Sequence, residues 1–220
     1  MVARLLPLLY SRLPGFRGFR PGQTLHRIQY RTVRRRFLGA ALTLPFASIG
    51  AAVAQSLTLT PACDEKPERT PSQTAGPYYS PNSPQRGSLV EPGSKAERLV
   101  LTGLVLSPQC KPVANALLDF WHCDEVGEYD NRGFRYRGHV LADAQGRYRL
   151  ETIVPGEYPG RTRHIHVNVR PSGAQVLTTQ LYFPNERGNR SDGIYRPELT
   201  MKLALTDGRR DARFDFVVAA

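Results

Sequence analysis

The sequence predicts an all-β protein, an antiparallel β-sandwich with long loops between its strands. Short apolar or alternating segments recur through residues 99–220, and turn-forming residues separate them. No segment shows a sustained helical period. About 120 residues of this kind can enclose one hydrophobic core.

Seven segments have strand character. The first, from Leu99 to Leu106, is an apolar run that ends at Ser107-Pro108, and residues 147–153 alternate between polar and apolar side chains. The other segments are similarly short and lie between turn signals. In chain order, we expect strands at residues 99–106, 116–123, 138–143, 147–153, 164–169, 176–183 and 213–218.

The first 54 residues have the pattern of a twin-arginine signal peptide. Arg34-Arg35-Arg36 precedes an uncharged apolar stretch, and Ala52-Val53-Ala54 is a small-residue cleavage site. The pattern predicts export to the periplasm or the cell exterior. The stretch is short for a membrane span and contains Pro45, so we expect no stable span after cleavage. The alternative is a retained N-terminal anchor or amphipathic arm.

The net charge of +11 does not indicate a nucleic-acid-binding protein. Nine arginines and no acidic residue lie in residues 1–54. The remainder of the chain contains 21 Lys and Arg residues and 19 Asp and Glu residues, so its charges nearly balance. A nucleic-acid-binding domain would keep its basic excess in the folded part.

Residues 55–98 are rich in Pro, Ser, Gly and Thr and have no period. This composition predicts an ordered arm or a loop and no core element. Packing is the expected role of Tyr78 and Tyr79. Nothing in this stretch could form a helical dimerisation region, so the oligomeric state stays open.

Three cysteines in an exported chain predict one disulfide and one free thiol. Cys63 and Cys110 both lie in turn-rich sequence, so they are the expected pair. Cys123 follows Trp121-His122 in an apolar strand and is expected to be a buried thiol. The absence of a CxxC spacing argues against a zinc–cysteine site.

The stretch from Tyr158 to Val169 is the strongest candidate for a site. His164 and His166 are two residues apart on a predicted strand, so their side chains project from the same face, about 7 Å apart along the backbone. Such a pair can bind one metal ion. Two alternatives remain open: structural or surface histidines, and a metalloenzyme that adds a carboxylate to the pair. Glu157 is near in sequence but has no distinctive spacing.

Two tyrosines lie in loops close to this stretch. Tyr158 stands six residues before His164, and Tyr129 follows the strand that contains Trp121. A phenol with a pKa near 10 is a poor ligand for zinc. A trivalent cation favours the phenolate, so two phenolates and two imidazoles favour Fe(III).

Four motifs, in order between about residues 74 and 205, resemble the intradiol ring-cleavage dioxygenases, which include the catechol 1,2- and protocatechuate 3,4-dioxygenases. They are Trp121…Gly127-x-Tyr129, Pro155-Gly156-x-Tyr158-Pro159, Arg161-x-x-His164-x-His166 and Thr179-Gln180-Leu181-Tyr182-Phe183. The likeness is to the small, exported, single-domain type.

The resemblance implies which residues form the site. The family's iron ligands, two tyrosines and two histidines, fall on Tyr129, Tyr158, His164 and His166. Its active-site arginine falls on Arg161 and its pocket glutamine on Gln180. Arg163 is a departure, since the family often has an apolar pair before the first histidine.

The resemblance also implies an activity and a domain plan. A non-haem Fe(III) dioxygenase would insert O2 into a catechol-type aromatic diol and give a cis,cis-muconate-type diacid, with no organic cofactor. Tyr158 would take a proton, Arg161 would stabilise negative charge, and Gln180 would orient the substrate. The alternative is a non-catalytic β-sandwich binding module. The expected plan is a signal peptide (1–54), an arm (55–98) and a catalytic β-sandwich with loops that carry the metal site (99–220).

Overall fold

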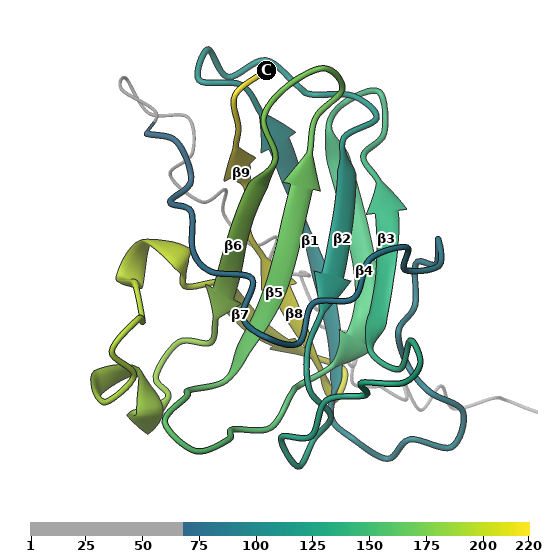
Figure 1. Ribbon diagram of the computed structural model, residues 1–220, viewed down its shortest axis with the longest axis vertical. Coiled ribbons are helices and arrows are strands. Elements are labelled where there is room, and N and C mark those ends of the chain that lie inside the picture. Colours follow the sequence, from purple (N-terminus) through teal and green to yellow (C-terminus); the bar gives the residue numbers. More distant parts are fainter. Residues whose placement is uncertain (1–67) are drawn as a thin grey trace, which may run out of the picture. The chain divides into compact units, whose positions relative to one another are not determined.

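The computed structural model describes residues 68–220, which form a two-sheet β-sandwich (Figure 1). This confirms the predicted fold class. In chain order the strands are β1 (Arg98–Leu106), β2 (Leu117–Trp121), β3 (Arg137–Leu141), β4 (Arg147–Ile153), β5 (His164–Arg170), β6 (Leu177–Tyr182), β7 (Lys202–Thr206), β8 (Arg209–Arg213) and β9 (Phe216–Val217).

One sheet has the order β4-β1-β8-β7, with β9 also beside β1, and the other has the order β3-β2-β5-β6. Most neighbouring strands are antiparallel, as predicted, but β1 pairs in parallel with both β8 and β9. Two short 3-10 helices, Arg187–Arg190 and Pro197–Leu199, lie between β6 and β7. Within residues 68–220, no helix has the length and apolar character needed to cross a bilayer.

The first six predicted strands are confirmed, with ends that differ by only a few residues. The prediction of one strand at residues 213–218 is wrong, because β8 ends at Arg213 and β9 begins at Phe216. The hairpin of β7 and β8 was not predicted. Both strands are largely half-exposed and β8 is rich in charge, so they carry no clear hydrophobic alternation. The Asp207-Gly208 turn, with positive φ at both residues, was the available signal.

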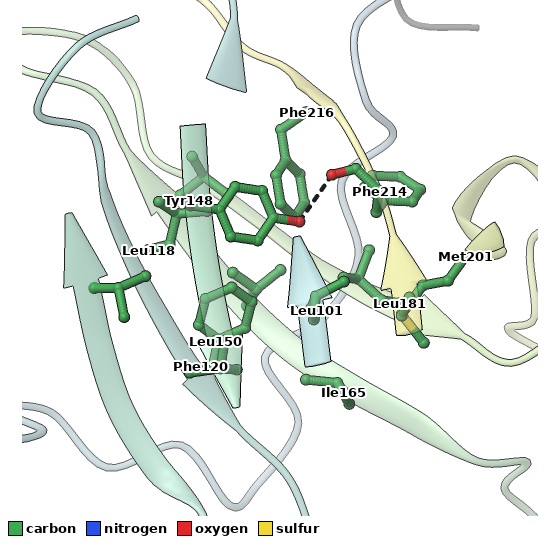
Figure 2. Packing of buried hydrophobic residues seen from close by; sticks show 14 of the residues in the cluster. Leu101, Leu118, Phe120, Tyr148, Leu150, Ile165, Leu181, Met201, Phe214 and Phe216 are labelled. Carbon is green, nitrogen blue, oxygen red and sulfur yellow. Dashed lines mark hydrogen bonds between the residues drawn. The ribbon is translucent and has the colours of Figure 1, made fainter. Parts of the chain in front are cut away.

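Side chains along β5 alternate between the hydrophobic core and the opposite face of the sheet, where the candidate site lies. Ile165, Val167 and Val169 point into the core between the sheets and are fully buried. Leu118 from the adjacent strand β2 and Leu101, Tyr148 and Leu150 from the other sheet join the same cluster, parts of which are drawn in Figure 2. His164, His166 and Asn168 therefore project from the opposite face of β5.

The segment before β1 is an ordered arm that crosses this opposite face (Figure 1). The backbone N–H of Gln73 donates to Thr178 O of β6 (2.8 Å), and that of Arg86 donates to His139 O of β3 (3.0 Å). The expectation that the arm adds nothing to the core is wrong at one position, since Leu89 is fully buried in the cluster. The predicted boundary at residue 54 lies outside the described residues.

The cysteines agree with their predictions as far as the structure describes them. Cys123 is free and buried, and its thiol donates to Gly156 O (3.5 Å). Burial raises the pKa of this thiol to about 12, so it stays protonated and unreactive. Cys110 is disulfide-bonded. Cys63, its predicted partner, lies outside the described residues.

Gly103 marks the point where β1 changes partner from β8 to β9. A Cβ at this position would lie 1.7 Å from Phe214 O, an atom fixed by the Tyr148 hydroxyl at 2.8 Å (Figure 2). We expect Gly103→Ala to lower the free energy of unfolding by about 3 kcal/mol through overpacking. Urea unfolding would measure the loss. Gly87→Ala is the control, because a Cβ there has nothing within 4 Å. Equal stability of the two variants would contradict this account.

Candidate metal centre

Four residues of the candidate site, one from each strand, lie in one row across the sheet β3-β2-β5-β6. Arg137 pairs with Trp121, Trp121 with His166, and His166 with Gln180. Paired residues in adjacent strands project from the same face, so their side chains are neighbours. His164, two residues before His166 on β5, extends the group toward the loops.

The two histidines form the buried centre of this group. Each is 1% exposed, and their Nε2 atoms lie 3.2 Å apart. Nδ1 of His164 lies 2.6 Å from Thr162 O, which assigns the proton to Nδ1 and leaves a lone pair on Nε2. Burial lowers the pKa of His164 to about 4 and lowers that of His166 as well. Both imidazoles are therefore neutral near pH 7, which is the form that binds metals.

Trp121 fixes the plane of the His166 ring. The two rings are stacked, with centroids 4.9 Å apart and an interplanar angle of 8°. His166 Nδ1 and Trp121 Nε1 are both buried and have no hydrogen-bond partner among the described residues. The orientation of this imidazole thus depends on stacking against Trp121, which lies beside a candidate ligand.

Two loops bring the tyrosines to the histidines. Tyr158 Oη lies 3.2 Å from His164 Nε2, and the Tyr129 ring meets the Tyr158 ring edge-on at 5.8 Å. The loops touch at Gly127, which has φ +91° and where a Cβ would lie 2.4 Å from Glu157 O. Only glycine permits both this φ and this approach. The contact between the two loops therefore explains why a glycine stands two residues before Tyr129.

The environment of the two tyrosine hydroxyls would favour binding of a cation. Burial raises the pKa of both Tyr129 and Tyr158 despite the arginines nearby, so each remains a phenol near pH 7 until a metal cation binds. Tyr129 Oη is buried and has no hydrogen-bond partner among the described residues. A buried hydroxyl left unpaired is unfavourable, and a cation would satisfy it while favouring the phenolate.

The residues present fit ferric iron. Two facing imidazole nitrogens and two phenol oxygens form one compact donor group, and one of those oxygens lacks any other partner. The rival site, a histidine pair with a carboxylate, has no support, because residues 68–220 contain no group of three His, Cys, Asp or Glu side chains able to hold a metal.

Arg161 and Gln180 border the same centre. Arg161 donates to Tyr158 Oη (3.3 Å), to Asp192 Oδ2 (3.0 Å) and to Gln180 Oε1. Gln180 is fully buried, and its Nε2 donates to Thr74 O of the arm (3.0 Å). Both side chains thus lie where a charged or polar group could contact a substrate held at the centre.

Arg163 lies outside this group. Its guanidinium pairs with Glu186 (3.3 Å) and donates to Pro155 O (2.9 Å), which ties together the two loops beside the site. Of the two arginines before His164, only Arg161 contacts a candidate ligand. The sequence-based choice of Arg161 over Arg163 agrees with this geometry.

Asp192 is a site residue that the sequence analysis missed. It is buried, and its Oδ2 accepts from both Arg161 Nε and the backbone N–H of Thr162 (3.1 Å). It comes from the loop after β6, far from the motifs, and a lone Asp in a Gly- and Ser-containing loop carries no spacing signal. Its contacts fix the direction of the Arg161 side chain.

Replacing Asp192 by asparagine should release Arg161 from its orientation. The variant keeps the size of the side chain but removes its charge, so we expect kcat/KM for the reaction at this centre to fall by about 10- to 100-fold. The exposed pair of Arg209 and Asp211 supplies the control, Asp211→Asn, which should leave kcat/KM unchanged. Thermal unfolding would separate this effect from simple destabilisation. Wild-type kinetics in Asp192→Asn would refute the role.

The arm closes one side of the centre. Tyr78 stacks on Tyr129, with ring centroids 4.3 Å apart, and a Cβ at Gly76 would lie 3.5 Å from His166 Cε1. Tyr78, Tyr129 and Tyr158 help to line a cavity of about 400 Å³. Tyr78 is therefore a wall of the cavity as well as a packing residue. Tyr79 does pack as expected, against Trp121.

The remaining histidines of the described region, His122 and His139, bond to groups outside the candidate ligands. His122 is buried between Cys123 O (2.6 Å) and Thr152 Oγ1 (2.6 Å), and burial lowers its pKa to about 4. His139 Nδ1 lies 2.8 Å from Ser83 O. Neither ring contacts a candidate ligand tyrosine or histidine through a hydrogen bond.

The fold and the site together define a class of protein: a β-sandwich in which one sheet face and two loops unite two tyrosines with two histidines. Comparison with known proteins agrees. The sequence pattern of the dioxygenase family matches residues 74–219. The chain belongs to the intradiol ring-cleavage dioxygenase family.

Three relatives illustrate the match. Chlorocatechol 1,2-dioxygenase of Pseudomonas sp. strain P51 is 30% identical over 65% of this chain and 68% of its own length. The β chain of protocatechuate 3,4-dioxygenase from Burkholderia cepacia is 37% identical over 41% of this chain and 46% of its own. The chain thus spans about half to two thirds of these relatives.

The third relative is a solved structure, the dioxygenase domain of a dioxygenase–carbohydrate-binding protein fusion from the cellulolytic bacterium Streptomyces sp. SirexAA-E. It is 47% identical and has a TM-score of 0.68. The match covers 70% of this chain and 99% of that domain. The sandwich and its loops are therefore shared almost completely with a protein described as a dioxygenase domain.

Proposed function

We propose that the protein is a non-haem Fe(III) dioxygenase that cleaves the ring of a catechol-type diol between its two hydroxyl-bearing carbons. Both atoms of O2 enter the product, a cis,cis-muconate-type diacid. The observation that carries this proposal is the donor group of Tyr129, Tyr158, His164 and His166, with the Tyr129 hydroxyl buried and without a partner.

These four residues would hold the iron. When bound, ferric iron would supply Lewis-acid chemistry by holding the diol as its anion and drawing charge from the ring. The cavity of about 400 Å³ beside Tyr129 and Tyr158 has room for a single aromatic ring.

The chain's own groups account for the proton and charge movements. Tyr158 Oη lies at the edge of the donor group and accepts a hydrogen bond from Arg161 (3.3 Å), so as the phenolate that a bound cation favours it would be suited to take a proton from the diol. Arg161 can then stabilise negative charge on the ring. Gln180, held by Thr74 O, can orient the substrate through its carboxamide.

Colour and oxygen consumption test the proposal together. The purified, iron-loaded protein should absorb in the visible through tyrosinate-to-Fe(III) charge transfer and should consume O2 with catechol. The double variant Tyr129→Phe, Tyr158→Phe should be colourless and inactive. A colourless wild-type protein that is replete with iron would exclude the assignment, and O2 uptake without colour would exclude the tyrosine ligands. A coloured protein that is inactive on catechol, hydroxyquinol and protocatechuate would favour the non-catalytic alternative.

We further propose that the protein is exported by the twin-arginine route, on the basis of residues 34–54. Expression with an intact N-terminus should give a mature chain that begins at Gln55. Replacing Arg34 and Arg35 by lysine should leave the precursor inside the cell. N-terminal sequencing of both fractions tests this, and an unprocessed exported chain would indicate a retained anchor instead.

A further inference from the structure

Arg137 is a buried cation that has no ion-pair partner in the part of the chain that the structure describes. Its side chain is 1% exposed, and it donates only to carbonyl oxygens, those of Asp130 (3.0 and 2.8 Å) and Tyr78 (2.5 Å). Among residues 68–220, no carboxylate forms an ion pair with it. Buried charges in proteins are normally paired with an opposite charge, so its position needs a reason.

The nearest carboxylates are engaged elsewhere. That of Asp130 accepts three backbone N–H groups of its own loop, and one oxygen of Asp119 accepts from Ser83 Oγ (2.6 Å) while the other accepts from Tyr79 Oη (3.2 Å). Both still attract Arg137 over a longer distance. Neither carboxylate accepts a hydrogen bond from the Arg137 guanidinium.

The guanidinium lies beside the ring of Tyr129. Its Cζ is 5.9 Å from the ring centroid. The two carbonyls that it binds belong to Asp130, the next residue in the chain, and to Tyr78, whose ring stacks on Tyr129. Arg137 therefore fastens the loop on one side of Tyr129 and the arm on the other.

The arginine beside the other tyrosine is different. Arg161 contacts Tyr158 but is already paired with Asp192 at 3.0 Å. Of these two arginines, only Arg137 brings a charge that no carboxylate contact compensates. A buried guanidinium that forms no ion pair within residues 68–220 thus lies beside Tyr129, whereas the guanidinium beside Tyr158 is paired with Asp192.

We propose that Arg137 is a positioning residue that compensates the negative charge of the Tyr129 phenolate in the iron-bound protein and so strengthens iron binding through Tyr129. This inference rests on the proposed function.

Two substitutions at Arg137 separate charge from hydrogen bonding. Arg137→Gln keeps a donor but removes the charge, so Fe(III) binding by the full chain should weaken by about 10- to 100-fold. Its charge-transfer band should move to longer wavelength, because the electron-rich phenolate loses the cation that stabilises it. Arg137→Lys keeps the charge with fewer donors and should bind iron within about threefold of wild type. Competition with a chelator of known affinity and visible absorption measure both quantities.

Arg132→Gln is the matched control. It removes a positive charge from the loop that precedes Arg137, but its side chain is exposed, so affinity and band should stay as in wild type. Wild-type iron affinity and band position in Arg137→Gln would overturn the proposal, as would equal losses in the Gln and Lys variants. If Arg137→Gln does not fold, the iron affinity of Arg137→Lys tests the proposal by itself, and a loss well beyond threefold would overturn it. Failure of the proposed function would look different, since wild type itself would then lack the band.

Discussion

His166→Ala should remove both iron binding and ring cleavage. His166 is a buried member of the donor group, and its Nε2 faces that of His164 at 3.2 Å. Loss of an outer hydrogen-bond partner lowers metal affinity by about 10- to 100-fold, so loss of a ligand should exceed about 100-fold. The iron content of the purified variant and O2 uptake with catechol provide the measurement.

The control for this change is His139→Ala. His139 lies on the same face of the same sheet, two strands away, but bonds to Ser83 and not to the donor group. It should keep iron and colour even if stability falls. If His166→Ala bound iron as tightly as wild type, the assignment of the metal to this strand would be wrong.

Tyr158→Phe should slow turnover by about 10²- to 10³-fold while iron stays bound. Three of the four donors remain, but the oxygen that lies 3.2 Å from His164 Nε2 and 3.3 Å from Arg161 is lost, and with it the acceptor for a substrate proton. Single-turnover kinetics would detect the change, and the visible band should persist through Tyr129.

Tyr195→Phe removes a hydroxyl that bonds only to Thr200 Oγ1 (2.9 Å), so it is a suitable control and should turn over normally. Loss of iron from Tyr158→Phe would mean that Tyr158 is a structural ligand above all. Unchanged turnover would remove Tyr158 from the proton pathway.

Local pattern was sufficient for most of the fold. The alternation in β5 assigned Ile165 to the core and His166 to the opposite face, and the structure has both there. The same reasoning could not find β7, whose Leu205 is 75% exposed, because an outer strand of this kind has little apolar periodicity. Parallel pairing of β1 with β8 also leaves no local signature.

The candidate site was predictable where its chemistry follows a spacing. His164 and His166 share a face because strand geometry requires it, whereas Tyr129 and Tyr158 were noted only as loop residues near the histidines and were assigned as ligands through the resemblance. Asp192 and Arg137 were missed, since each acts through contacts with residues distant in sequence. Such contacts depend on how the loops and the arm return to the sheet, which no period in the sequence encodes.

The position of β1 has a consequence for how the protein folds. Leu99 pairs with Arg210 of β8 and Val105 with Phe216 of β9, so one edge of β1 stays unpaired until nearly the whole chain exists. Sheets closed by such distant segments have high contact order, and they fold in about milliseconds to seconds. A ribosome-bound chain would expose this apolar edge throughout synthesis, which makes chaperone protection of β1 an expected step in its biogenesis.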